Sequence, residues 1–136
     1  MLFRSTNSNV PVQVSGLSDL VAVSAALHHS LAIRSDGTVW AWGYNLYGQL
    51  GNGTNADSNV PVQVRGLTDA VAVAGGWGHS LAVRSDGSVW AWGWNTYGQL
   101  GDGTNTDSNV PVSTLRVTRV GAVAAGAYHS LAIRTD

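Results

Sequence analysis

Residues 78–93 read Gly-His-Ser-Leu-Ala-Val-Arg-Ser-Asp-Gly-Ser-Val-Trp-Ala-Trp-Gly, and this stretch decides the fold. Residues 29–43 are an earlier copy of it, and residues 129–136 begin a third. Successive copies begin 50 residues apart. A fixed period of roughly 20–50 residues is typical of a repeat protein, so we expect each period to fold as one structural unit.

Each period predicts four short strands. Residues 79–84 alternate apolar and polar side chains, as a half-buried strand does. The Asp-Gly pair that follows predicts a hairpin turn, because glycine accepts a positive φ, and residues 89–93 form the next strand. Upstream, residues 71–74 predict an inner strand of small side chains. Residues 60–64 contain a proline, which cannot donate to a sheet, so they predict an edge strand.

Four strands in each period of 50 residues, without helical periodicity, predict an all-β fold made of antiparallel β-propeller blades. Closed propellers have about 4–8 blades. A chain of 136 residues holds about 2.7 periods of 50, so it is predicted to form an incomplete propeller. Large aromatic side chains on the strands are expected to form the core between blades, and they are Trp40, Trp42, Trp90 and Trp92.

The period divides the chain into one repeat domain with four parts. A short head covers residues 1–7, repeat 1 covers 8–57, repeat 2 covers 58–107, and a partial repeat 3 covers 108–136. The head corresponds in register to residues 51–57 but differs from them in sequence, so we expect a disordered remnant. By the same pattern, residues 10–14 are predicted to form the first edge strand.

Composition excludes several classes of partner. The net charge is −1 and only 11% of residues are charged. This composition argues against nucleic-acid binding, because proteins that bind nucleic acid carry a basic surface. There is no cysteine, and hence no disulfide framework or thiolate metal site. No apolar run approaches the roughly 18 residues of a membrane span, and no signal peptide stands out. The sequence calls for no cofactor and assigns no compartment.

The internal copies differ mainly in two places, residues 24–28 against 74–78 and the start of the long connection after the Trp strand. Antiparallel strands bring both places to one face, here called the loop face. Variable aromatic loops on a fixed scaffold are typical of a binding surface. The predicted binding residues are Leu27, His28, Tyr44, Leu46, Trp77, Trp94 and Tyr128. Tyr47 and Tyr97, identical in both copies, are expected to pack within blades.

A longer motif consists of Ala74-Gly75, residues 79–82, residues 86–93, Asn95 and residues 98–101. This motif resembles the regulator of chromosome condensation repeat, in the form found in bacterial members, which include a propeller-type β-lactamase inhibitory protein. The resemblance covers nearly the whole chain and implies a propeller, usually of seven blades, that serves as a protein-binding platform. Neither of two known roles of the family, nucleotide exchange on a small GTPase and β-lactamase inhibition, carries over residue by residue.

One histidine per period invites a metal or catalytic interpretation, because three histidines can bind zinc. Equivalent positions in successive blades are separated around a ring, however, so His29, His79 and His129 are expected to make structural hydrogen bonds to neighbouring loops. The serine beside each has no acid partner or nucleophile elbow. Residues 102–107 offer clustered oxygens but lack the EF-hand pattern, so turn-stabilising hydrogen bonds are expected instead of calcium. No metal site is predicted.

Three functions remain open. The favoured one is non-enzymatic protein binding through the loop face, because the sequence offers no acid–base pair that converges in one cleft. The second is homo-oligomerisation that closes the propeller between chains, because a lone chain leaves apolar blade faces open. The third is a lectin-like site in which sugars stack on exposed tryptophans.

At the inner turn, residues 25–28 lack the glycines of residues 75–78. If this turn requires a positive φ, the backbone of the first copy is expected to be strained there.

Overall fold

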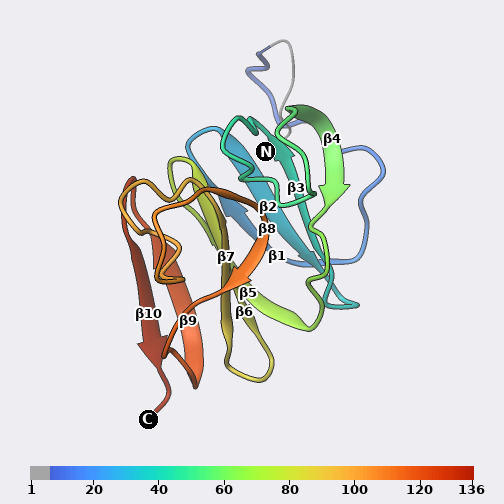
Figure 1. Ribbon diagram of the computed structural model, residues 1–136. Coiled ribbons are helices and arrows are strands. Elements are labelled where there is room, and N and C mark those ends of the chain that lie inside the picture. The colour runs from blue at the N-terminus through green and yellow to red at the C-terminus, as the bar shows by residue number, and fades with distance from the viewer. Residues whose placement is uncertain (1–6) are drawn as a thin grey trace.

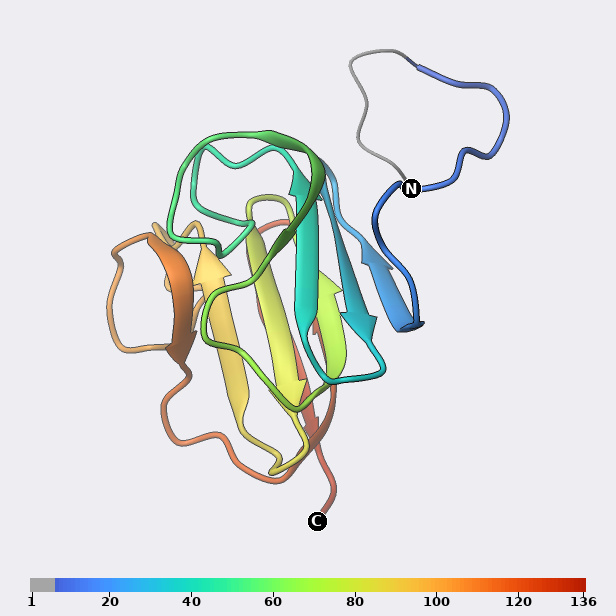
Figure 2. The same ribbon diagram turned by 90° about the vertical axis from the view of Figure 1, so that its right-hand side faces the viewer.

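The structure is a computed structural model that describes residues 7–136. Within this range it contains ten β-strands and no helix. The head predicted over residues 1–7 falls, apart from Asn7, outside the described residues. No helix of the described part is long and apolar enough to cross a membrane. The strands form three antiparallel sheets that stand side by side, as Figures 1 and 2 show.

The first two sheets are complete four-stranded blades. Their strands follow chain order, which is the order expected from the sequence pattern, and each neighbour is antiparallel. The first blade consists of β1 (Leu20–Ala25), β2 (His29–Arg34), β3 (Val39–Gly43) and β4 (Ser58–Gln63). The second consists of β5 (Ala70–Gly75), β6 (His79–Arg84), β7 (Val89–Gly93) and β8 (Ser108–Ser113).

The third sheet is a half blade made of β9 (Val120–Ala125) and β10 (Ser130–Arg134). Its two strands correspond to the inner strand and the His-Ser strand of the complete blades. The predicted all-β architecture of incomplete propeller blades is therefore confirmed. In Figure 1 the half blade lies at the opposite side of the structure from β4.

The predicted edge strand over residues 10–14 is wrong, because these residues belong to no strand. In both complete blades the proline strand pairs with the Trp strand of the preceding copy, as β4 pairs with β3 and β8 with β7. The described residues before Val10 contain no such strand. A proline-bearing segment without its pairing partner has no ladder to join, and Val10 is 62% exposed.

The turns show where glycine is needed. Gly37 and Gly87, in the Asp-Gly hairpins, have φ of 80° and 78°, as the hairpin signal predicted. The inner turns use no positive φ at residues 25–28 or 75–78, so the strain considered for the first copy does not arise. Glycine serves close packing there instead, because a Cβ on Gly76 would lie 2.6 Å from the carbonyl oxygen of Gly126.

The core lies between blades rather than within one. Trp92 is fully buried and packs with side chains of both complete blades, including Leu31 and Ile33 of the first. Trp90 is half-buried against the same cluster. In the first blade Trp42 is buried, whereas Trp40 is half-buried and donates its indole N–H to the Thr38 hydroxyl. Leucines of the two long connections, Leu50 and Leu100, are fully buried.

Candidate binding surface

The long connection after β3 is held in shape from within by Asn45, which is fully buried. Its side-chain amide donates to the carbonyls of Thr54 at 3.0 Å and Ala56 at 2.9 Å. Its side-chain oxygen accepts the backbone N–H of Leu50 at 2.9 Å, and its own N–H donates to the Asp57 carboxylate at 2.7 Å. One residue thereby ties both ends of the loop together, although the loop contains turns but no helix or strand.

The connection after β7 repeats this arrangement around Asn95, whose N–H donates to Asp107 at 2.7 Å and whose side-chain oxygen accepts from Leu100 at 2.9 Å. Asp102, weighed above as a calcium ligand, accepts hydrogen bonds from the Asn95 amide and the Thr104 N–H of its own loop. Across residues 7–136 no group of three histidine, cysteine or acidic side chains is placed to hold a metal ion. The Asp102 carboxylate stabilises its own loop through the hydrogen bonds from Asn95 and Thr104.

An aromatic cluster extends across the loop face over all three blades. Its central pair, Trp77 and Trp94, has ring centroids 5.0 Å apart. The remaining rings follow from this pair in both directions, each within 6.5 Å of a neighbour. We define the aromatic cluster as His28, Tyr44, Tyr47, Trp77, Trp94, Tyr97 and Tyr128.

Tyr47 joins the first blade to the second within this cluster. Its ring lies 5.5 Å from Trp77 and 5.4 Å from Trp94, centroid to centroid. Gly78 makes the approach possible, because a Cβ there would lie 3.1 Å from the Tyr47 ring. Its counterpart Tyr97 lies 5.7 Å from Tyr128 of the half blade. The same tyrosine thus contacts the next blade at both junctions.

The structure brings five of the seven predicted binding residues into one cluster and leaves two outside the ring contacts. Leu27 and Leu46 are 61% and 56% exposed. Tyr47 and Tyr97, which sequence reasoning assigned to packing, belong to the cluster, and Tyr97 is 67% exposed. Their identity in both copies made them look structural. The signal that could have found them is their position three residues after the variable aromatic positions 44 and 94.

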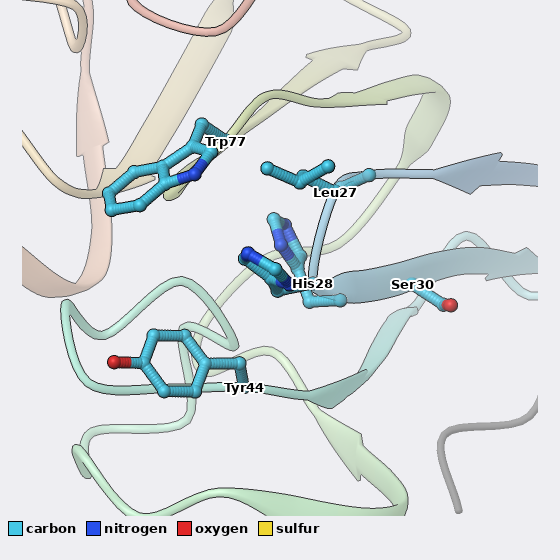
Figure 3. A pocket seen from close by; sticks show the side chains of 7 residues that line it. Leu27, His28, Ser30, Tyr44 and Trp77 are labelled. Atoms are coloured by element: carbon cyan, nitrogen blue, oxygen red, sulfur yellow. The ribbon is translucent and has the colours of Figure 1, made fainter. Parts of the chain in front are cut away.

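A pocket of about 400 Å³ opens beside the cluster on the first blade. Figure 3 shows the side chains of Leu27, Trp77 and Tyr44 around one space, with His28 between them. The walls are mainly apolar and aromatic, which is typical of sites that bind apolar groups. The residues that line it are Ala26, Leu27, His28, His29, Ser30, Tyr44 and Trp77.

Beneath the loop face, a histidine of one blade is hydrogen-bonded to a serine of the next. His29 Nε2 lies 2.8 Å from Ser80 Oγ, and Ser80 Oγ donates to the carbonyl of Gln49 at 2.9 Å. The hydroxyl has one hydrogen, so it accepts from His29, which must carry its proton on Nε2. Burial, followed by the charges of His79 and His28, lowers the pKa of His29 from 6.5 to about 3. The imidazole is therefore neutral.

The second junction uses the same link. His79 Nε2 lies 3.0 Å from Ser130 Oγ, which donates to the carbonyl of Gln99 at 2.8 Å. Burial lowers the pKa of His79 from 6.5 to about 4. His129, in the half blade, is exposed. The expected hydrogen bonds exist for two histidines, but their partner is a strand serine of the next blade and not a loop.

The opposite face, at the Asp-Gly hairpins, has a different character. It carries ion pairs such as Arg84 with Asp69 at 3.4 Å and Arg119 with Asp136 at 2.8 Å. These side chains are partly exposed, and pairs of this kind contribute little to stability. The aromatic cluster, by contrast, contains no arginine or acidic side chain.

Tandem four-stranded antiparallel blades, joined by a buried His-Ser link and a long tied connection, define a repeat protein of the β-propeller class. The chain belongs to the regulator of chromosome condensation (RCC1) repeat family. One model of this repeat matches residues 36–83 and 86–133, and a second matches residues 20–49 and 70–99. Propellers built from these repeats are commonly protein-binding scaffolds and typically non-enzymatic.

Curated relatives match over about one repeat. The human probable E3 ubiquitin-protein ligase HERC4 is 46% identical over 48 residues, which are 34% of this chain and 4% of that protein. The ultraviolet-B receptor UVR8 of Arabidopsis thaliana is 42% identical over 50 residues, 35% of this chain and 11% of the receptor. The matched segment thus spans only a small part of each relative.

Solved structures match nearly the whole chain. Human WBSCR16 superposes with a TM-score of 0.83 at 26% identity, covering 97% of this chain and 36% of that one. Yeast RCC1 (Prp20), solved with Kap60 bound, gives 0.76 at 24% identity and covers 88% and 31%. Prp20p from Saccharomyces cerevisiae, described with its binding to Gsp1p and histones, gives 0.77 at 21% and covers 89% and 32%. The two yeast matches support the fold alone.

Proposed function

We propose that this chain is a protein-binding module without enzymatic activity of its own, and that it contacts its partner through the aromatic cluster. The observation that carries the proposal is the continuity of the cluster, in which rings from three blades lie within 6.5 Å of a neighbour. Tyrosine and tryptophan are the residues most often found as energetic anchors of protein interfaces.

Two further features support this proposal. Tyr97 and Tyr128 are 67% and 55% exposed, so they present ring surface that a partner can cover. The two long connections, which carry Tyr44, Tyr47, Trp94 and Tyr97, are held by the buried side chains of Asn45 and Asn95. Little ordering entropy is therefore lost in these connections when a partner binds. Because the cluster consists of aromatic rings and contains no arginine or acidic side chain, the expected partner surface is apolar or aromatic.

The test is to select peptides from a displayed random library on the whole chain and to measure their affinity for surface variants. We expect Tyr97→Ala and Tyr128→Ala to weaken binding about tenfold or more, as loss of an interface anchor does. The matched control is Val71→Ala on β5, because Val71 is 57% exposed but lies outside the cluster. The proposal would be overturned if the selected peptides bound the variant with both Tyr97→Ala and Tyr128→Ala as tightly as they bind the Val71→Ala control.

Titration of the chain with a panel of sugars tests the lectin alternative. Quenching of tryptophan fluorescence by one sugar, lost in Trp77→Ala, would assign the cluster to carbohydrate and contradict the protein-binding proposal. Absence of quenching across the panel would remove the lectin alternative.

Self-assembly is a second candidate function, favoured by apolar side chains exposed at both ends of the row of blades. Val21 and Val23 of β1 are 65% and 70% exposed, and Leu131 and Ile133 of β10 are 60% and 68% exposed. Light scattering after size exclusion, over a range of concentrations, measures the mass. A discrete dimer or trimer would support it, and a monomer at every concentration would remove it.

A further inference from the structure

Asn52, in the long connection after β3, is the one asparagine of the sequence that is followed by glycine. Asparagine is a thermolabile residue, because the backbone nitrogen of the next residue can attack its side-chain carbonyl carbon. Glycine leaves that nitrogen unshielded, since it has no Cβ. Gly53 has a φ of 84°, and a Cβ on it would lie 3.0 Å from Nη1 of Arg65. The turn therefore requires the residue that exposes Asn52 to attack.

The connection keeps the reacting atoms of this pair close together. Oδ1 of Asn52 accepts the backbone N–H of Thr54 at 3.2 Å and the Thr54 hydroxyl at 2.9 Å. The first of these bonds closes an Asx-turn, a ring of atoms that includes both Cγ of Asn52 and the nitrogen of Gly53. Holding two reacting groups near each other raises the rate of their reaction. Asn52 is half-buried, so water also reaches it.

The same hydrogen bonds stabilise the charge that the attack creates. Negative charge develops on Oδ1 of Asn52, and both donors of Thr54 already point at this atom. Donors preorganised around a developing oxyanion lower the barrier of such a reaction. The leaving group is not held, because Nδ2 of Asn52 makes no hydrogen bond within the described part of the chain.

A positive charge without an ionic partner stands beside this turn. Arg65 lies next to Gly53, and it takes part in no ion pair in the part of the chain that the structure describes. Its guanidinium attracts negative charge on the connection, both on the oxyanion and on a carboxylate product. In the second copy the equivalent residue, next to Gly103, is the uncharged Leu115.

The second connection shows that a carboxylate fits this turn. Asp102 stands at the position equivalent to Asn52, and it accepts the N–H and the hydroxyl of Thr104 at 3.0 and 2.9 Å. It also accepts a hydrogen bond from the Asn95 amide at 3.1 Å. An aspartate at position 52 would therefore keep the bonds that shape the turn.

We propose that Asn52 is a site of spontaneous deamidation, assisted by Thr54 and Arg65, which places a carboxylate on the first long connection. The nitrogen of Gly53 loses its proton to hydroxide and bonds to Cγ of Asn52. The bond from Cγ to Nδ2 breaks, and the amide leaves as ammonia with a proton from water. Water then opens the cyclic imide, giving aspartate by attack at Cγ or isoaspartate by attack at the backbone carbonyl. Nothing is oxidised or reduced.

One contact sets the pace of the reaction. The Gly53 N–H donates to the carbonyl of Asn109 in β8 at 2.9 Å, and this bond must open before the proton can leave. The folded chain therefore reacts slowly, and one negative charge is added to its net charge of −1 as it ages.

The test incubates the whole chain at several pH values above neutral and follows each asparagine by peptide mass spectrometry. We expect conversion at Asn52, with a rate that rises with the hydroxide concentration. Asn55 of the same connection, which is exposed and followed by alanine, is the internal control and should stay intact. The proposal is overturned if Asn52 stays intact while the urea-unfolded chain is converted, or if Asn55 reacts as fast.

Two variants at position 54 test whether the turn assists the reaction. Thr54→Val removes the hydroxyl donor and should slow the conversion about threefold or more. Thr54→Ser keeps the donor and should react at the rate of the parent protein. Circular dichroism shows whether each variant is folded. An unchanged or faster rate in folded Thr54→Val would overturn the proposed assistance.

Arg65→Leu, which reproduces the residue of the second copy, tests the role of the charge. At low salt it should react about twofold more slowly than the parent protein, and the two rates should converge at about 1 M salt, where the charge is screened. Equal rates at low salt would contradict the part assigned to Arg65.

Discussion

The junction between the first two blades and the junction between the second blade and the half blade contain the same parts, except for one tryptophan. Both have the His-Ser link and a buried leucine from the long connection. At the first junction, side chains around Leu31, Ile33 and Trp92 form one continuous cluster. At the second, the counterparts Leu81 and Val83 fall into two separate clusters.

The difference shows what each strand of a blade contributes. Two strands, β9 and β10, are enough to bury Leu81 and Val83 and to form the bond between His79 and Ser130. The third strand brings the indole that merges the two apolar clusters into one. Different strands of a blade therefore align it with its neighbour and fill the space between the two.

The largest expected effect on stability comes from removing the Trp92 side chain, which fills the first junction. Trp92→Ala should lower the free energy of unfolding by an amount near the upper end of the roughly 3–5 kcal/mol typical of buried tryptophan. The half-buried Trp90 is the matched control, and Trp90→Ala should cost clearly less. Urea denaturation measures both. Equal costs would contradict the sealing role of Trp92.

Acid should weaken both junctions together. The pKa values of His29 and His79 are lowered by burial to about 3 and about 4, from 6.5. Stability is therefore full above about pH 6.5 and falls below it, because the unfolded chain binds protons that the folded chain excludes. At about 1.4 kcal/mol per pH unit for each histidine, the two should cost about 4 kcal/mol by about pH 5.

Urea denaturation between about pH 7 and pH 5 checks this slope. In His79→Gln the slope should fall to about half, because one of the two titrating groups is gone. Unfolding free energy that stays constant over this range in the parent protein would contradict the burial of neutral histidines.

A smaller effect separates the two links. Ser80→Ala leaves His29 Nε2 without an acceptor in a fully buried position, which costs about 1–3 kcal/mol. Ser130→Ala removes the equivalent bond of His79, but Ser130 is half-buried and water can replace the hydroxyl. We expect a cost below about 1 kcal/mol there. If thermal denaturation gave the reverse order, the first junction would not be the better sealed one.

The strand order of the blades could be predicted because the period repeats all its signals, with alternation at residues 79–84, a glycine at the hairpin and tryptophans two apart. The edge strand over residues 10–14 failed for a non-local reason. A strand signal gives the conformation that a segment prefers, but pairing depends on a partner elsewhere, and the described residues provide none for this segment.

The candidate site was predictable in part. Comparison of the internal copies found His28, Trp77 and Trp94 because they differ between copies. It missed Tyr47, because identity between the copies indicates that a residue is required but does not show which residues it contacts. The partner of each histidine was missed for the same reason. A serine always follows the histidine, and that constant pair was the available signal for a link that crosses from one blade to the next.

The buried asparagine of each long connection has a consequence for how such repeats diverge. Asn45 fixes the path of the backbone through its side chain. Tyr44 and Leu46, on either side of it, contribute backbone hydrogen bonds, which do not depend on the identity of their side chains. In the second copy these two neighbours are Trp94 and Thr96, around an unchanged Asn95. Under the proposed function, the shape of the loop and the choice of partner would therefore be inherited separately. A duplicated blade would then acquire a new specificity by one or two substitutions, without passing through an intermediate that fails to fold.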